Sequence, residues 1–264
     1  MTSTKLSTVL SQRPLGLVFD IDGTLSPIAP TPDSAYLYPG VMSMLEQMRQ
    51  HVHVAIMTGR ALRDGARMVD VDNITYIGTH GLEWSDGLPA THSVQVVPDA
   101  MSYVEPGKQL LNLVERHLES LPGVIVQRKS IGGTLHYRNT SDHEQTRLRL
   151  LALLKEPAHQ MGMRLSEGKM VVEVLAPLAI NKGQALRRYV QQFKLRGVVF
   201  AGDDRTDIDA AREIVRLRQE GIAALTIVVR HQDTLPELLE LADITVEGVE
   251  GMAKLMQEMV ERFS

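Results

Sequence analysis

The feature that most constrains this chain is a short apolar run that ends abruptly in two carboxylates. Residues 16–19, Gly-Leu-Val-Phe, have the composition of a fully buried strand, and Asp20 and Asp22 follow at once. Open α/β sheets bind their ligands at the carboxyl ends of such strands. Taken alone, the pattern also fits a strand that runs into an acidic, solvated turn, so the rest of the chain must decide.

Composition narrows the class of protein. The 264 residues are 44% hydrophobic and 23% charged, which indicates a globular chain of one large or two modest domains. The net charge of -4 provides no basic surface for nucleic acid or an anionic membrane. The chain has no cysteine, no signal-like apolar segment and no run of membrane-spanning length. We therefore expect a cytoplasmic protein, and a monomer because no sustained heptad appears.

The first and last thirds of the chain alternate strand and helix patterns. A helical stripe of Val41, Met44, Leu45 and Met48 precedes a buried strand at 52–57. This alternation predicts a parallel sheet with right-handed crossovers. Further strands are expected at 75–78, 197–201, 225–229 and 244–247, with helical sequence from about 61 and from 181.

The middle of the chain has a different pattern. Alternating strands at 93–97, 123–127, 133–138 and 170–174, with helices over about 103–118 and around 148–154, predict a small antiparallel sheet covered by helices on one face. The expected fold class is α/β, a doubly wound core over 1–87 and 179–264. An α+β cap at 88–178 is inserted into it.

Four loops of the core carry groups suited to phosphoryl transfer. A carboxylate can attack phosphorus and form an aspartyl-phosphate, and a second carboxylate can move the proton. Crowded carboxylates imply a cation, and oxygen ligands favour Mg²⁺. A lysine and a hydroxyl can hold the phosphoryl oxygens. The candidate residues are Asp20 and Asp22, Thr58, Lys182, and Asp203 with Asp204 and Asp207.

In this order, the four loops resemble the motifs of the haloacid dehalogenase superfamily of phosphatases. The insertion resembles the α/β cap of the superfamily's Cof-like branch. The resemblance implies that Asp20 is the nucleophile, Asp22 the general acid and base, and Thr58 and Lys182 the phosphoryl-binding residues. It also implies Mg²⁺ on Asp20, on the main-chain carbonyl of Asp22 and on Asp203. Asp204 or Asp207 would contribute directly or through water.

A narrower resemblance spans nearly the whole chain. Residues 78–83, Lys129 with residues 136–138, and residues 168–173 are similar to segments of trehalose-6-phosphate phosphatases. The resemblance implies that these segments face the sugar, and Arg60 could line the same cleft. His136 and Arg138 also fit the outer face of a half-buried strand, whereas Glu173 stands among valines and needs a partner. The sugar-binding candidates are Arg60, His80, Glu83, Lys129, His136, Arg138 and Glu173.

The residues that depart from the family pattern lie in or beside the expected sugar-binding segments, and the catalytic motifs are intact. Thr79 replaces the usual Asn or Ser, residues 132–134 replace Ser-Leu-Ala, and Leu175 stands where a basic residue is common. The leading hypothesis is a Mg²⁺-dependent phosphatase acting on a small-molecule sugar phosphate, trehalose 6-phosphate. Another sugar phosphate, such as sucrose phosphate, glycosyl-phosphoglycerate or hexose phosphate, is the alternative. A non-catalytic sugar-phosphate sensor is a third possibility, which the retained Asp20 and Asp22 oppose.

Overall fold

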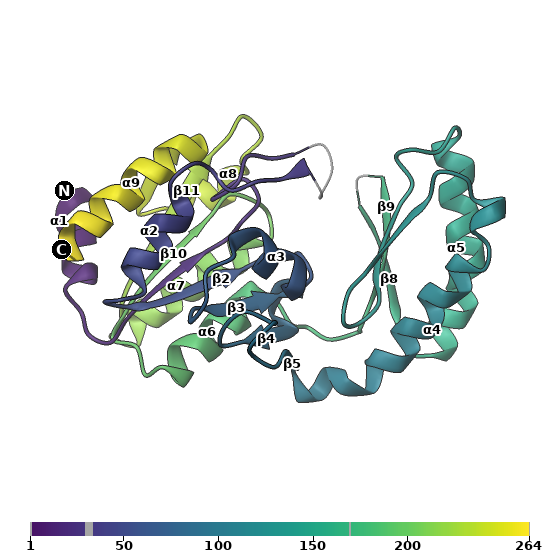
Figure 1. Ribbon diagram of the computed structural model, residues 1–264, viewed down its shortest axis with the longest axis horizontal. Helices are drawn as coiled ribbons and strands as arrows, with labels where there is room; N and C mark the ends of the chain where they lie inside the picture. The colour runs from purple at the N-terminus through teal and green to yellow at the C-terminus, as the bar shows by residue number, and fades with distance from the viewer. Residues whose placement is uncertain (1, 30–33, 169, 264) are drawn as a thin grey trace. The chain divides into compact units, whose positions relative to one another are not determined.

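The computed structural model describes residues 2–29, 34–168 and 170–263 (Figure 1). The chain forms two compact units, one of residues 1–95 with 180–264 and one of residues 96–179. Part of the proline-rich connection expected at 26–32, and Lys169 of the 168–173 segment, lie outside the described residues.

The first unit is built on an eight-stranded sheet with β1 (Leu15–Phe19) near its middle. β10 (Gly197–Gly202) pairs with one side of β1 and β2 (His53–Met57) with the other, both parallel to it. The order is β12-β11-β10-β1-β2-β3-β4-β5, so the second half of the chain returns beside the first. The remaining strands are β3 (Thr75–Gly78), β4 (Glu83–Ser85), β5 (Gln95–Val96), β11 (Ala223–Arg230) and β12 (Ile244–Glu247).

Helices cover both faces of this sheet (Figure 1). Leu17 and Phe19 of β1 pack into one core with α2 and α9, while Val18 packs into the opposite core with α6 and α7. Alternate residues of a strand point to opposite faces, so a strand buried on both sides is apolar throughout. The helices are α1 (Thr2–Leu10), α2 (Val41–Met48), α3 (Leu62–Val69), α6 (Lys182–Gln192), α7 (Asp207–Gln219), α8 (Pro236–Glu240) and α9 (Gly248–Phe263).

Most of the predicted pattern of the first unit is confirmed. The stripe on α2 is the buried face of that helix, as its 3.6-residue period predicts. The strands expected at 52–57, 75–78 and 197–201 form, and they pair in parallel. The sequence patterns did not reveal α1, and they did not reveal β4, which runs antiparallel to β3.

The second unit is a four-stranded antiparallel sheet in the order β6-β7-β9-β8. Its helices lie along one face (Figure 1), where Leu135, Val172 and Val174 are fully buried. The polar residues Thr134 and Glu173 sit opposite each other on the other face. Its elements are α4 (Val104–Glu115), β6 (Ile125–Arg128), β7 (Gly133–His136), α5 (His143–Gln160), β8 (Arg164–Gly168) and β9 (Val171–Leu175), with 3₁₀ turns at Pro98–Tyr103 and Leu118–Ser120.

The expected antiparallel sheet and its two helices are therefore confirmed, with one correction. The strand expected at 93–97 forms β5, which extends the eight-stranded sheet beyond β4 instead of joining the second unit. The sequence pattern did not reveal β8. Among the described residues, no helix combines the length and the apolar character needed to cross a membrane.

Candidate active site

The candidate site forms where two neighbouring parallel strands end. Phe19 of β1 pairs with Ala201 of β10, and the backbone N–H of Asp20 donates to the Ala201 carbonyl at 2.9 Å. Asp20 and Asp203 therefore emerge at the same edge of the sheet. Thr58 follows β2, the neighbour of β1 on the other side, so three of the predicted loops meet at this edge.

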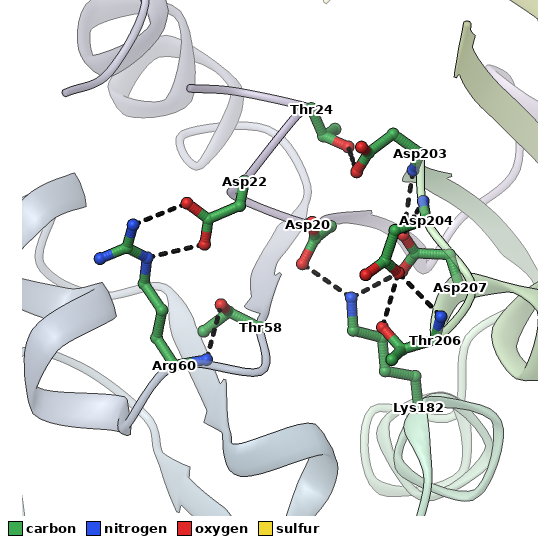
Figure 2. Close-up of polar contacts among 10 residues, drawn as sticks. All are labelled: Asp20, Asp22, Thr24, Thr58, Arg60, Lys182, Asp203, Asp204, Thr206 and Asp207. Carbon is green, nitrogen blue, oxygen red and sulfur yellow. Dashed lines mark hydrogen bonds and ion pairs between the residues drawn. The ribbon is translucent and has the colours of Figure 1, made fainter. Parts of the chain in front are cut away.

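Three buried carboxylates gather there. Oxygen atoms of Asp20, Asp203 and Asp207 all lie within 4.8 Å of one another. The ammonium of Lys182 is 2% exposed and donates to Asp20 Oδ1 at 2.7 Å and to Asp207 Oδ1 at 2.6 Å (Figure 2). One cation thus bridges two of the three acids.

Lys182 reaches the cluster because α6 begins beside α7. Asn181 caps α6 by accepting a hydrogen bond from the N–H of Gln184 at 3.0 Å, so Lys182 is the first residue of the helix. A Cβ at Gly183 would lie 2.5 Å from the Asp209 carbonyl oxygen. Only glycine permits this approach, which brings the first turns of both helices together.

Asp207 and Asp204 organise the second acidic loop. Oδ2 of Asp207 accepts the backbone N–H groups of Asp203, at 2.9 Å, and of Asp204, at 3.0 Å. Oδ1 of Asp204 accepts the backbone N–H and the hydroxyl of Thr206, at 2.8 and 2.7 Å. Both side chains thus stabilise the loop by accepting hydrogen bonds from its own residues. Metal ligation by Asp204 or Asp207 stays a prediction.

Burial and crowding shift the pKa values of this cluster. Burial raises the pKa of Asp20 well above its usual range. Burial, with the nearby charge of Asp20, raises the pKa of Asp203 to about 9. Burial alone would lower the pKa of Lys182, but the charges of Asp20 and Asp207 outweigh it, so that pKa is raised. Without another cation, the cluster cannot carry all of its negative charge.

The donor set therefore fits a hard divalent cation. It consists of carboxylate oxygens alone, and the chain has no cysteine to offer a softer ligand. The raised pKa values of Asp20 and Asp203 support the same conclusion. A bound cation would favour the ionised carboxylates, which burial and crowding disfavour.

Asp22 lies in a different environment from Asp20. Its carboxylate points away from the cluster toward Arg60, which donates from Nε to Oδ2 at 2.7 Å and from a terminal nitrogen to Oδ1 at 2.6 Å (Figure 2). This paired hydrogen bond raises the pKa of Arg60. The Asp22 side chain is 42% exposed, so it remains accessible to a ligand. The backbone N–H of Arg60 donates to Thr58 Oγ1 at 3.1 Å.

His80 and Glu83 belong to the loop beside these residues. The His80 ring lies against Gly59, where an added Cβ would come within 2.4 Å of it. Glu83 is buried, and its Oε2 accepts the backbone N–H of Leu62, the first residue of α3. Glu83 therefore stabilises the start of α3. Sugar binding by His80 and Glu83 stays a prediction.

The polar face of the second unit holds the other sugar-binding candidates. Lys129 Nζ lies 3.7 Å from Glu173 Oε1, and the two side chains are 7% and 29% exposed. His136 Nε2 lies 3.0 Å from Gln127 Oε1. Burial, with the charges of Lys129 and Arg138, lowers the pKa of His136, so its ring is neutral near pH 7. Glu173 thus has the partner that its apolar strand led us to expect.

Comparison with known proteins decides the family. The sequence model of the Trehalose-phosphatase family matches residues 18–236. The chain belongs to the trehalose-phosphatase family. A trehalose-phosphate phosphatase of Mycobacterium leprae (strain TN) is 31% identical over 234 residues, which cover 85% of this chain and 52% of that protein. The chain thus spans about half the length of the curated relatives that it matches.

Solved structures support the fold of this chain. A crystal structure of a trehalose-6-phosphate phosphatase related protein matches with a TM-score of 0.75 and 24% identity, over 94% of this chain and 97% of that one. A haloacid dehalogenase-like hydrolase from Bacteroides thetaiotaomicron matches with a TM-score of 0.62 and 11% identity, over 94% and 100%. The predicted haloacid dehalogenase core with an added cap is therefore confirmed as a fold.

In this chain, one part of the predicted site comes together and another part does not. Asp20, Lys182, Asp203 and Asp207 form one buried cluster. The carboxylates of Asp22 and Asp204 lie outside it, although the main-chain carbonyl of Asp22 remains the expected ligand. The sequence patterns did not single out His231, which contacts the first acidic loop, because no local motif surrounds that residue.

Proposed function

We propose that this chain is a Mg²⁺-dependent phosphatase that hydrolyses trehalose 6-phosphate to trehalose and phosphate. The observation that carries the proposal is the buried Asp20 carboxylate, hydrogen-bonded to Lys182 and beside Asp203, in a chain of the trehalose-phosphatase family. A buried carboxylate held by one lysine is poised to act as a nucleophile. The segments expected from the sequence, 1–87 with 179–264 and 88–178, would be the catalytic core and the cap.

In the first step, an Asp20 oxygen attacks phosphorus, and the bond from phosphorus to the sugar oxygen breaks. Asp22 donates its proton to that departing oxygen. In the second step, Asp22 takes a proton from water, the water oxygen attacks the aspartyl-phosphate, and Asp20 is released. Lys182 and the Thr58 hydroxyl hold the phosphoryl oxygens in both steps.

Asp20, Asp203 and the main-chain carbonyl of Asp22 would hold Mg²⁺, with Asp204 or Asp207 contributing directly or through water. When bound, Mg²⁺ neutralises the charge that develops on the phosphoryl group. The paired hydrogen bond from Arg60 holds the Asp22 carboxylate apart from the cluster. Asp22 must therefore turn from Arg60 toward the departing oxygen before it can serve as the acid.

The sugar-binding roles of Lys129, His136, Arg138 and Glu173 are part of the proposal. Their polar face offers two cations, a neutral imidazole and a carboxylate, a mixture suited to sugar hydroxyls. Leu175 and the segment 132–134 differ from the family pattern, which favours testing other sugar phosphates beside trehalose 6-phosphate. A cytoplasmic monomer remains our proposal for the location and state of the chain, and sedimentation analysis would test the latter.

The decisive experiment is phosphate release by the purified chain. Trehalose 6-phosphate, sucrose 6-phosphate and glucose 6-phosphate are compared with Mg²⁺ and with EDTA. We expect trehalose 6-phosphate to be preferred, and Asp20→Asn to lower its turnover by about 10³-fold or more. Asp209→Asn, an exposed acid on α7, is the matched control. Equal turnover of all three substrates would contradict the sugar assignment, and an active Asp20→Asn variant would contradict the covalent mechanism.

Asp22 can be tested separately through the leaving group. Asp22→Asn should slow trehalose 6-phosphate by about 10²-fold or more, because an alkoxide needs a proton to depart. In the pre-steady-state burst, before hydrolysis of the aspartyl-phosphate limits the rate, it should slow p-nitrophenolate release much less, since p-nitrophenolate leaves unaided. Equal losses in the first-step rates of both substrates would contradict the assignment of Asp22 as the general acid.

A further inference from the structure

The turn between Asp20 and Thr24 packs directly against Asp203. Gly23 has a φ of +80°, and a Cβ there would lie 1.9 Å from Asp203 Oδ2. The hydroxyl of Thr24 donates to Asp203 Oδ1 at 3.3 Å. The two loops that carry the acidic cluster therefore touch through Gly23, and any shift of this turn changes the spacing of the carboxylates.

Several backbone N–H groups of the turn donate to carbonyls of the same turn. The N–H of Gly23 donates to Ser26 at 2.8 Å, and the N–H groups of Thr24, Leu25 and Ser26 donate to the Ile21 carbonyl. The Gly23 carbonyl instead accepts from a residue far along the chain. That residue is His231, whose Nε2 lies 2.7 Å from the Gly23 oxygen.

This contact determines which ring nitrogen of His231 carries a proton. A carbonyl oxygen can only accept, so Nε2 of His231 must carry the proton. The same Nε2 lies 3.9 Å from Asp203 Oδ2, beyond hydrogen-bonding distance, which leaves that oxygen available for a cation. His231 itself is anchored, because its backbone N–H donates to Thr234 Oγ1 at 2.8 Å.

We propose that His231 is a positioning residue for the divalent-cation site. It follows β11, and its hydrogen bond ties the turn after β1 to the loop after β11 while β10 and Asp203 lie between them. The bond fixes the turn that presents Asp20 and the Asp22 carbonyl against Asp203. His231 does not touch the cation and takes no part in proton transfer. This inference rests on the cation site of the proposed function.

Two substitutions separate this role from a general effect of changing the histidine. The amide nitrogen of glutamine occupies nearly the same place as Nε2, so His231→Gln can still donate to the Gly23 carbonyl. The amide of asparagine corresponds to Nδ1 and falls short, so His231→Asn loses the bond. Both replacements are neutral amides that differ by one methylene. His117→Gln, in the second unit, is the control, because His117 also bonds a main-chain carbonyl, that of Leu113 at 2.8 Å.

The readout is Mg²⁺ binding measured by titration calorimetry without substrate. We expect His231→Asn to weaken Mg²⁺ binding by about tenfold, as changes behind metal ligands commonly do, and His231→Gln and His117→Gln to stay within about twofold of wild type. In turnover assays, His231→Asn should need more Mg²⁺ for half-maximal rate, while its rate at saturating Mg²⁺ stays close to wild type.

Unchanged Mg²⁺ affinity in His231→Asn would overturn the inference, as would equal losses in the Gln and Asn variants. Wild-type protein that binds Mg²⁺ but releases no phosphate would contradict the proposed function and leave the positioning role intact. Wild-type protein that binds no Mg²⁺ would contradict both. If His231→Asn does not fold, a weakened Mg²⁺ affinity in His231→Gln would still contradict the inference.

Discussion

The ammonium of Lys182 lies 2.7 Å from a carboxylate oxygen of Asp20, although the two residues stand 162 positions apart in the chain. The pair is almost completely buried, and Lys182 contacts Asp207 as well. A buried charge is tolerated only when it is paired, so the acids and the lysine stabilise each other's presence in the site.

Replacing Lys182 should therefore destabilise the protein as well as inactivate it. Lys182→Met leaves Asp20 and Asp207 buried without their cation, and the free energy of unfolding should fall by about 3–5 kcal/mol in EDTA. Urea denaturation measures this loss, and added Mg²⁺ should recover part of it. Lys155→Met, at an exposed position of α5, is the control. If the free energy of unfolding falls no more than in the control, the buried carboxylates do not depend on Lys182 and are neutralised by protonation instead.

The metal-free protein should lose stability as the pH rises. Asp203 has a pKa of about 9 when folded and an ordinary value of 3.8. Between these values the folded chain holds a proton that the unfolded chain releases, so this contribution is complete below about pH 4 and is lost as the pH rises through about 9. In EDTA, unfolding free energies should fall by about 1 kcal/mol per pH unit from pH 5 to 8.

Mg²⁺ should reverse this trend, because a bound cation favours the ionised carboxylates. Asp203→Asn should flatten the metal-free profile, since the amide does not titrate. A metal-free stability that rises between pH 5 and 8 would contradict the raised pKa of Asp203.

Glu83 should prove important for stability through α3. Glu83→Ala removes the acceptor for the Leu62 N–H and should lower the free energy of unfolding by about 2 kcal/mol. Glu46→Ala, on the exposed side of α2, should change it little. Urea denaturation and substrate KM are measured on the same samples. A raised KM with unchanged stability would instead favour the sugar-binding role of Glu83.

Glu173 should affect binding of the sugar and not the phosphoryl-transfer steps. Glu173→Ala should lower kcat/KM for trehalose 6-phosphate by about 10- to 100-fold, since it loses hydrogen bonds to a charged acceptor, and leave p-nitrophenyl phosphate within about twofold. Glu167→Ala is matched, because Glu167 lies on the adjacent strand β8 and pairs with Arg147. Parallel losses on both substrates would indicate a structural role for the Lys129–Glu173 pair.

Local periodicity made much of the fold predictable. The strand at 16–19 is apolar on both faces because both faces are covered, and the spacing of Val41, Met44, Leu45 and Met48 marks the buried side of α2. β8 escaped prediction because it is a mostly exposed edge strand without apolar alternation. β4 escaped because it contains Glu83, whose buried carboxylate accepts the N–H of Leu62, 21 positions earlier in the chain.

The sequence by itself determined which chemical groups are present and that the loops after β1 and β10 carry them, because a parallel sheet brings carboxyl ends to one edge. Only the tertiary structure decided how those groups are divided. It paired Asp20 with Lys182 and Asp22 with Arg60, and it placed His231 on the Gly23 carbonyl from 208 positions away. Hydrogen bonds depend on the positions of single atoms, and no local pattern records a partner that lies so far along the chain.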